Sequence, residues 1–190
     1  MKQTEKLDAL QSELNSIRTP EIKAFASWAV KILPNYFFEV PASSTGKYHP
    51  EYALGEGGLL RHTKAAVGIA ATLLQTETFG NHYNQGQKDA ILCALILHDG
   101  AKSGIPKQKY TIKNHPRAIT AHLEKNVDAG DCSLTTDQRQ AIYGLIESHM
   151  GQWADSDADT PLPKPQTAAQ RFVHLCDYLA SRKQLEYKFL

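Results

Sequence analysis

Cysteine is scarce in this chain, and its cysteines are never closely spaced. The 190 residues include three, Cys93, Cys132 and Cys176, with no CxxC pair among them. An odd number of widely separated thiols is neither a disulfide framework nor the ligand set of a structural zinc site. We therefore expect reduced thiols and a cytoplasmic protein.

The sequence also lacks a long apolar run and a strong charge of either sign. Its longest apolar run, Ala90 to Leu97, is far shorter than the about 20 residues that span a bilayer. The amino-terminal segment is charged throughout, which is not typical of a secretory leader. The net charge is +1, so no overall field favours duplex nucleic acid or an anionic membrane. These absences predict no membrane partner and no strong duplex binding.

Runs of β-branched residues with a period of two are rare, so we expect little sheet. Apolar residues instead recur at steps of three and four, which is the period of an amphipathic helix. A length of 190 residues suits one domain, so we predict a single all-α domain over residues 1–190, with amino-terminal helices within 1–34. Expected N-caps are Thr19, Thr136 and Thr167. The predicted helices lie near residues 7–17, 20–33, 59–78, 87–99, 116–127, 136–149 and 167–185.

A long irregular stretch, residues 35–58, separates the second predicted helix from the third. Loops of this length are uncommon in compact domains and are often functional. His49 lies in this stretch and is a candidate for lining a substrate cleft. Ser44, Lys47 and Arg61 are further candidates for contacts to a phosphate or to the rest of a substrate.

Six histidine and aspartate residues on or beside the predicted helices are of the types that bind divalent cations. Imidazole and carboxylate suit Mn, Fe, Co, Ni, Zn or Mg. A lone His-Asp pair is usually a surface or capping pair, but His98-Asp99 directly follows the apolar run, so a buried helix delivers both residues at its carboxyl end. Gly100 is the expected stop of that helix. The six residues are His62, His98, Asp99, His115, His149 and Asp177.

The order of these residues resembles the HD superfamily of metal-dependent phosphohydrolases. The pattern H…HD…D is opened by GGLLRHT at residues 57–63, and HDGAK at 98–102 is similar to the family's HDIGK box. The segment 48–63 is similar to the start of the HD domain of bacterial 3′–5′ exoribonucleases. The resemblance covers roughly residues 45–185. Two departures are Gly100-Ala101 in place of Ile-Gly, and Met150 in place of the second histidine of an SHH element.

The resemblance implies a helical bundle with a central His/Asp site for one or two divalent cations, with Mn or Fe favoured. The first cation is implied to be bound by His62, His98, Asp99 and Asp177, and Asp99 bridges to a second that His115 and His149 complete. Asp99 and Lys102 are the implied catalytic residues, Lys102 as a phosphate partner or proton donor. The implied reaction is attack of activated water on a phosphoester of a nucleotide or short nucleic acid.

Two other functions are compatible with this pattern. Di-iron oxygenases that resemble HD proteins share the ligand order and cleave C–C or C–P bonds instead. A helical binding module could also retain the metal site only for stability or sensing. Lys102, at the last position of the HDxxK pattern, favours hydrolysis over oxygenation. The nearly intact ligand set and Lys102 also argue against a module without catalysis, which has no need of the lysine.

Overall fold

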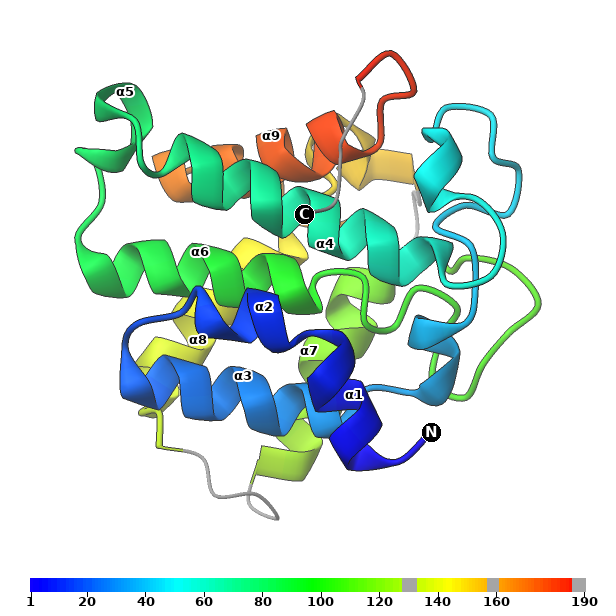
Figure 1. Cartoon of the computed structure of the whole chain (residues 1–190), viewed down its shortest axis with the longest axis horizontal. Coiled ribbons are helices and arrows are strands. Elements are labelled where there is room, and N and C mark those ends of the chain that lie inside the picture. Colours follow the sequence, from blue (N-terminus) through cyan, green and yellow to red (C-terminus); the bar gives the residue numbers. More distant parts are fainter. Residues whose placement is uncertain (128–132, 157–160, 186–190) are drawn as a thin grey trace.

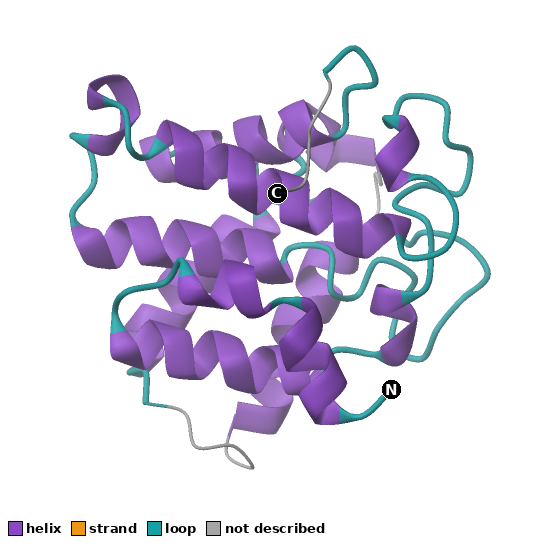
Figure 2. Ribbon diagram, in the orientation of Figure 1, coloured by secondary structure: helices purple, strands orange, loops and turns teal. Residues whose placement is uncertain are grey.

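The computed structural model describes residues 1–127, 133–156 and 161–185, and these residues are helical with no β-strand among them (Figures 1 and 2). This confirms the predicted all-α class. The α-helices are α1 (Gln3–Ala9), α2 (Gln11–Asn15), α3 (Pro20–Ile32), α4 (Gly58–Leu73), α5 (Glu77–Gly80), α6 (Gln85–Leu97), α7 (His115–Asn126), α8 (Thr136–Glu147) and α9 (Ala168–Ala180). Short 3-10 helices are η1 (Asn35–Phe38), η2 (Glu51–Ala53) and η4 (Gly151–Ser156).

Helix α6 is the centre of the bundle because it is apolar on nearly every side. The side chains from Ile91 to Leu97 are all buried, and α3, α4, α8 and α9 pack around them. A helix that is apolar all round is stable only when neighbours cover it on every face. Its burial carries His98 and Asp99, the next residues along the chain, into the interior.

Two long irregular segments lie together at one end of the bundle. In Figure 1 the chain of α6 runs to the right, and the loops between residues 39–57 and 98–114 lie at that end. Helix α4 begins and helix α9 ends on the same side (Figure 1). Residues from well-separated parts of the sequence therefore meet where α6 ends.

Several helix boundaries differ from those predicted. The helix expected over residues 7–17 is two helices divided at Leu10, and the helix expected over 59–78 ends at Leu73, with α5 following separately. The last predicted helix ends at Ala180 rather than Leu185. Local periodicity continues through these breaks, so periodicity alone could not locate them.

The three expected N-caps have different outcomes. Thr167 caps α9 in a capping box with Gln170, as predicted. The cap of α8 is Thr135, so the prediction of Thr136 was wrong by one residue. Thr19 holds the N-cap position of α3 but does not cap it with its side chain.

Thr19 instead joins α3 to α6 through a buried carboxylate. Its backbone N–H and its hydroxyl donate to Oδ2 of Asp89, at 2.7 and 2.6 Å. The other oxygen of Asp89 accepts from Nε2 of Gln85 at 2.9 Å. A negative charge near the amino terminus of α3 also complements the dipole of that helix.

The sequence also predicted reduced thiols and no apolar run long enough to span a membrane. Cys93 and Cys176 are free, as expected, and both are buried, whereas Cys132 lies outside the described residues. None of the described helices is long and apolar enough to cross a membrane.

Helix α4 begins where two backbone segments come unusually close. A Cβ on Gly58 would lie 2.2 Å from the carbonyl oxygen of Ala53 and 3.1 Å from Cα of Pro41. We expect Gly58→Ala to lower the free energy of unfolding by about 1–3 kcal/mol, because backbone atoms must move to admit the methyl group. Urea unfolding measures this change. Gly86→Ala is the control: its Cβ would meet only Oδ1 of Asn84, at 3.5 Å, so a loss of equal size there would contradict the explanation.

Candidate metal centre

Five segments of the chain bring the six predicted residues together. His62 lies in the second turn of α4, His98 and Asp99 follow α6, and His115 opens α7. His149 follows α8, and Asp177 lies in α9. All are buried except Asp177, whose side chain is 18% exposed. Within the described residues, sets of three that could hold a cation are His62/His98/Asp99, His98/His149/Asp177 and Asp99/His115/His149, with ligand atoms within 4.8 Å of one another.

The two oxygens of Asp99 face two different pairs of histidines. Oδ2 lies 3.7 Å from Nε2 of His62 and 3.4 Å from Nε2 of His98. Oδ1 lies 3.0 Å from Nε2 of His115 and 3.7 Å from Nε2 of His149. Two ligands bound at about 2.1 Å to one cation lie about 3.0–3.4 Å apart. The distances to His98 and His115 are within this range, and those to His62 and His149, at 3.7 Å, are slightly longer. The carboxylate is placed to be shared between two cations.

The two halves of the centre differ in charge. Oδ1 of Asp177 lies 2.9 Å from Nε2 of His62 and 3.5 Å from Nε2 of His98, so the half around these histidines faces two carboxylates. In the half around His115 and His149 the nearest carboxylate is Asp99, and Asp177 approaches only His149, within 4.8 Å. Met150, in place of a second histidine, offers only a thioether, a weak acceptor. The first half is therefore the stronger site for a divalent cation.

Three of the histidines are oriented by the same local contact. His98, His115 and His149 each donate Nδ1–H to the carbonyl three residues earlier, at 2.7, 2.8 and 2.7 Å. That bond fixes the tautomer and leaves the Nε2 lone pair for a cation. Nε2 of His98 is buried and has no hydrogen-bond partner. An orphaned buried acceptor facing two carboxylates fits a cation well. The accepting carbonyls are those of Leu95, Ile112 and Ile146.

The protonation states also suit a cation. Burial alone would raise the pKa of Asp99, but Lys102 and His98 hold that pKa well below its usual value. Burial would likewise raise the pKa of Asp177, yet the hydrogen bond from His62 and the nearby His98 lower it. Burial lowers the pKa of His149 to about 3. At neutral pH the centre thus offers charged carboxylates and a neutral imidazole, the forms that bind metals.

Lys102 lies directly against the shared carboxylate. Its Nζ is 2.9 Å from Oδ1 and 2.7 Å from Oδ2 of Asp99, and its side chain is 16% exposed. A carboxylate has about four lone-pair sites, so Asp99 can accept from Lys102 and still bind cations. The ammonium is thus placed beside the centre, at the boundary with solvent.

The residues proposed from sequence for substrate contacts lie in different surroundings. The half-buried His49 has its ring 5.6 Å from that of His62, and burial lowers its pKa to about 4. Ser44 and Lys47 are exposed on the loop before it. Arg61 stabilises the loop itself, because its guanidinium donates hydrogen bonds to the carbonyls of Tyr52 and Leu54. Arg61 is therefore not among the substrate contacts that we propose.

Gly100 does not end α6 in the way the sequence suggested. The helix ends at Leu97, and Gly100 is not among the glycines with positive φ. A Cβ on Gly100 would lie 2.6 Å from Cδ2 of Leu33 and 2.9 Å from Cδ1 of Ile119. The glycine is needed for close packing against Leu33 and Ile119 rather than for a left-handed turn.

Sequence reasoning missed three residues at the border of the centre, Tyr48, Tyr178 and Arg182. Cζ of Arg182 lies 4.5 Å from the ring centroid of Tyr178 and 5.8 Å from that of Tyr48. Tyr48 and Tyr178 adjoin His49 and Asp177 in the chain, and this adjacency was the one available signal.

Fold and site together define an all-helical protein with a buried His/Asp centre suited to divalent cations. The HD domain family matches residues 59–182, more than half of the chain, and the protein belongs to this family. The predicted resemblance to the HD superfamily is thereby confirmed. Members of the family are in general metal-dependent phosphohydrolases. No curated protein and no solved structure matches the chain.

Proposed function

We propose that this protein hydrolyses a phosphoester of a nucleotide or of a short single-stranded nucleic acid, with one or two divalent cations as cofactors. The observation that carries the proposal is Asp99, whose two oxygens face separate histidine pairs while Lys102 contacts the same carboxylate. Mn or Fe is favoured by this mixture of imidazole and carboxylate donors.

Cations bound between these residues would activate a water and offset charge on both the attacked and the leaving oxygens of a phosphoester. The protein's own contribution is orientation and charge. His98, His115 and His149 are held by their Nδ1–H bonds, so their Nε2 atoms need no reorganisation. The ammonium of Lys102 is a compact charge that can bind a phosphoryl oxygen and stabilise it as the bond breaks.

The charge around the centre supports an anionic substrate. Between Asp99 and Glu124 the sequence contains no acidic residue, whereas it contains several basic ones. Lys107, Lys109 and Arg117 are exposed on this segment, which leads from Asp99 to α7. The similarity of residues 48–63 to exoribonuclease HD domains adds oligonucleotide ends to the candidates. The basic residues of this segment are Lys102, Lys107, Lys109, Lys113 and Arg117.

An activity screen that combines each metal ion with each candidate substrate tests the proposal. The purified chain is stripped with EDTA, reloaded with Mn, Fe, Co, Ni, Mg or Zn, and incubated with nucleotides, cyclic nucleotides and short oligonucleotides. We expect release of phosphate or nucleotide with Mn or Fe, loss of turnover with EDTA, and recovery when the metal is restored. Oxygen consumption by the iron form without phosphoester cleavage would instead identify an oxygenase. A metal-dependent rise in melting temperature with no turnover of any substrate would identify a binding module.

A further inference from the structure

We infer that an aromatic surface beside the centre binds the nucleobase of the substrate; the inference rests on the proposed function and names the residues that would select a nucleotide. This surface, here called the base platform, consists of Tyr48, Trp153, Tyr178 and the guanidinium of Arg182. The rings of Trp153 and Tyr178 stack with centroids 5.9 Å apart and planes 16° apart. Cζ of Arg182 lies 4.5 Å from the Tyr178 centroid, 5.8 Å from that of Tyr48 and 5.9 Å from that of Trp153.

The base platform is joined to the metal centre on two sides. Tyr178 directly follows Asp177, and Tyr48 directly precedes His49, whose ring contacts that of His62. The backbone N–H of Lys183 donates to the carbonyl of Tyr48 at 3.0 Å, which ties the loop to the end of α9. A phosphoester at the centre would therefore have this aromatic surface as a neighbour.

A third connection runs through His174. Its Nδ1–H donates to the carbonyl of His149 at 2.7 Å, and its ring lies 6.0 Å from that of Trp153. Gly151 leaves room for this ring, since a Cβ there would lie 2.2 Å from it. The position of Trp153 is thus fixed relative to a histidine of the centre.

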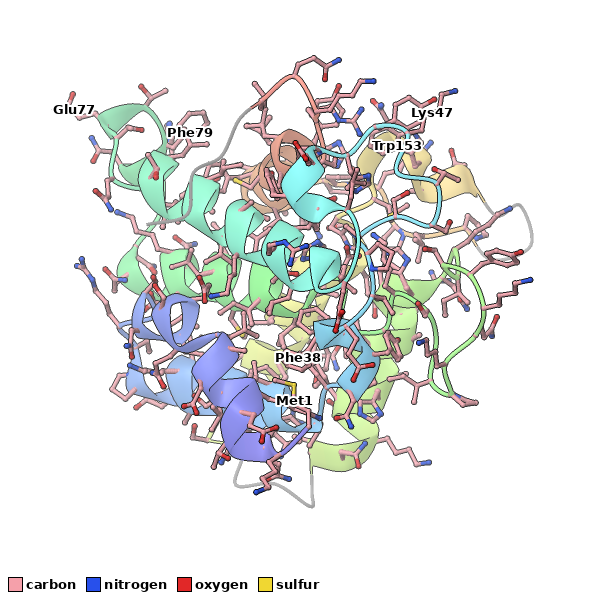
Figure 3. The ribbon with its side chains drawn as sticks, turned by 45° about the vertical axis from the view of Figure 1, so that its right-hand side comes forward. Met1, Phe38, Lys47, Glu77, Phe79 and Trp153 are labelled. Carbon is pink, nitrogen blue, oxygen red and sulfur yellow. The ribbon has the colours of Figure 1, made fainter. Side chains whose placement is uncertain are left out.

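Two aromatic side chains of the base platform are exposed to solvent, although large aromatic rings are usually buried by packing. Tyr48 is 54% and Trp153 39% exposed, and the described residues contain one other large aromatic side chain this exposed, Tyr110. Lys47 and Trp153 project from neighbouring parts of the same surface in Figure 3, and Arg182 contacts both Trp153 and the tyrosine that follows Lys47. Exposed aromatic rings beside a reaction centre are suited to stacking on a base.

The positive charge of the base platform indicates a ligand that combines an aromatic ring with a phosphate group. Arg182 donates to Oγ of Ser181, and no carboxylate of the described residues lies within ion-pair distance of it. Nζ of Lys47 lies 5.1 Å from the Tyr48 centroid on the same surface. A nucleotide supplies both the flat ring that stacks on aromatic faces and the anion that these cations attract. A sugar phosphate without a base could use only the cations.

Tryptophan fluorescence tests the platform without requiring turnover. The chain has two tryptophans, so Trp28→Phe leaves Trp153 as the reporter. The Mg²⁺-loaded variant is titrated with AMP, GMP, CMP and UMP, and with ribose 5-phosphate as the base-free probe. We expect saturable quenching by at least one nucleotide and none by ribose 5-phosphate. Adding Tyr48→Leu should weaken that binding by about 5- to 100-fold, the range for loss of one base-stacking partner. Tyr110→Leu, at a tyrosine of similar exposure, should leave it unchanged.

The outcomes separate the platform from the hydrolytic activity. No quenching by any nucleotide, or equal quenching by ribose 5-phosphate, overturns the platform even if the wild-type protein hydrolyses nucleotides. Nucleotide-specific quenching without hydrolysis supports the platform and counts against the proposed reaction. If Trp28→Phe does not fold, equilibrium dialysis of AMP with wild-type protein and with Trp153→Leu gives the same comparison; equal affinities would then overturn the platform.

Discussion

Asp99→Ala should abolish both metal binding and turnover. Asp99 is the residue whose two oxygens face both histidine pairs, so its removal takes a ligand from each half of the centre at once. It also leaves the ammonium of Lys102 without its carboxylate partner, and this uncompensated positive charge repels a divalent cation. Metal analysis after dialysis measures the first effect, and a phosphoester assay measures the second.

A second buried aspartate provides the control for this experiment. Asp89 is as buried as Asp99 but bonds Thr19 and Gln85, away from the histidines. Asp89→Ala should lower the free energy of unfolding by about 1–3 kcal/mol, because Thr19 loses its acceptor, and should leave metal content unchanged. Full metal occupancy in Asp99→Ala would refute the shared-carboxylate assignment, and loss of metal in both variants would point to general unfolding.

Lys102→Ala should lower turnover by about 10²- to 10³-fold without lowering metal content. An ammonium has no lone pair and cannot be a ligand, so its removal takes nothing from the coordination sphere. What is lost is a preorganised charge beside Asp99, and removal of one such group commonly costs this much in rate. Metal affinity should stay the same or rise, since a positive charge is removed 2.7 Å from an Asp99 oxygen.

A lysine from the same segment separates this effect from a change in overall charge. Lys109 is exposed, with Nζ 5.2 Å from the Tyr110 ring centroid, and carries the same charge as Lys102. Lys109→Ala should lower turnover by no more than a few-fold with the same substrate, because Lys109 adds to the general positive charge of the segment but contacts the Tyr110 ring rather than Asp99. Unchanged kinetics in Lys102→Ala would show that its contact with Asp99 is only structural.

The gathering of the candidate metal ligands could be predicted because it depends on local features of the sequence. The apolar run of α6 predicts a buried helix, and His98-Asp99 must follow it into the interior. His98, His115 and His149 share one local geometry, an Nδ1–H bond to the carbonyl three residues earlier, which needs no distant partner. The order of ligands then supplied the family resemblance, and the match over residues 59–182 confirms the family.

Roles that depend on side-chain direction could not be predicted in the same way. Arg61 is adjacent to His62 in the chain, yet its guanidinium holds the carbonyls of Tyr52 and Leu54. Thr19 has the sequence of an N-cap, yet Asp89 of α6 takes both of its donors. In each case a partner distant along the chain, or a loop conformation, offers a better hydrogen bond than the local one.

By itself, the sequence determined the helical class, the buried central helix and the residue types of the metal centre. These follow from periodicity and from the order of ligands, which act within a turn or along the chain. Only the tertiary structure decided that Asp99 faces two histidine pairs and that Lys102 contacts it on both oxygens. It alone also gathered Tyr48, Trp153 and Arg182 into one surface. Such contacts join segments far apart in sequence, and packing around α6, rather than any local pattern, sets the distances between them.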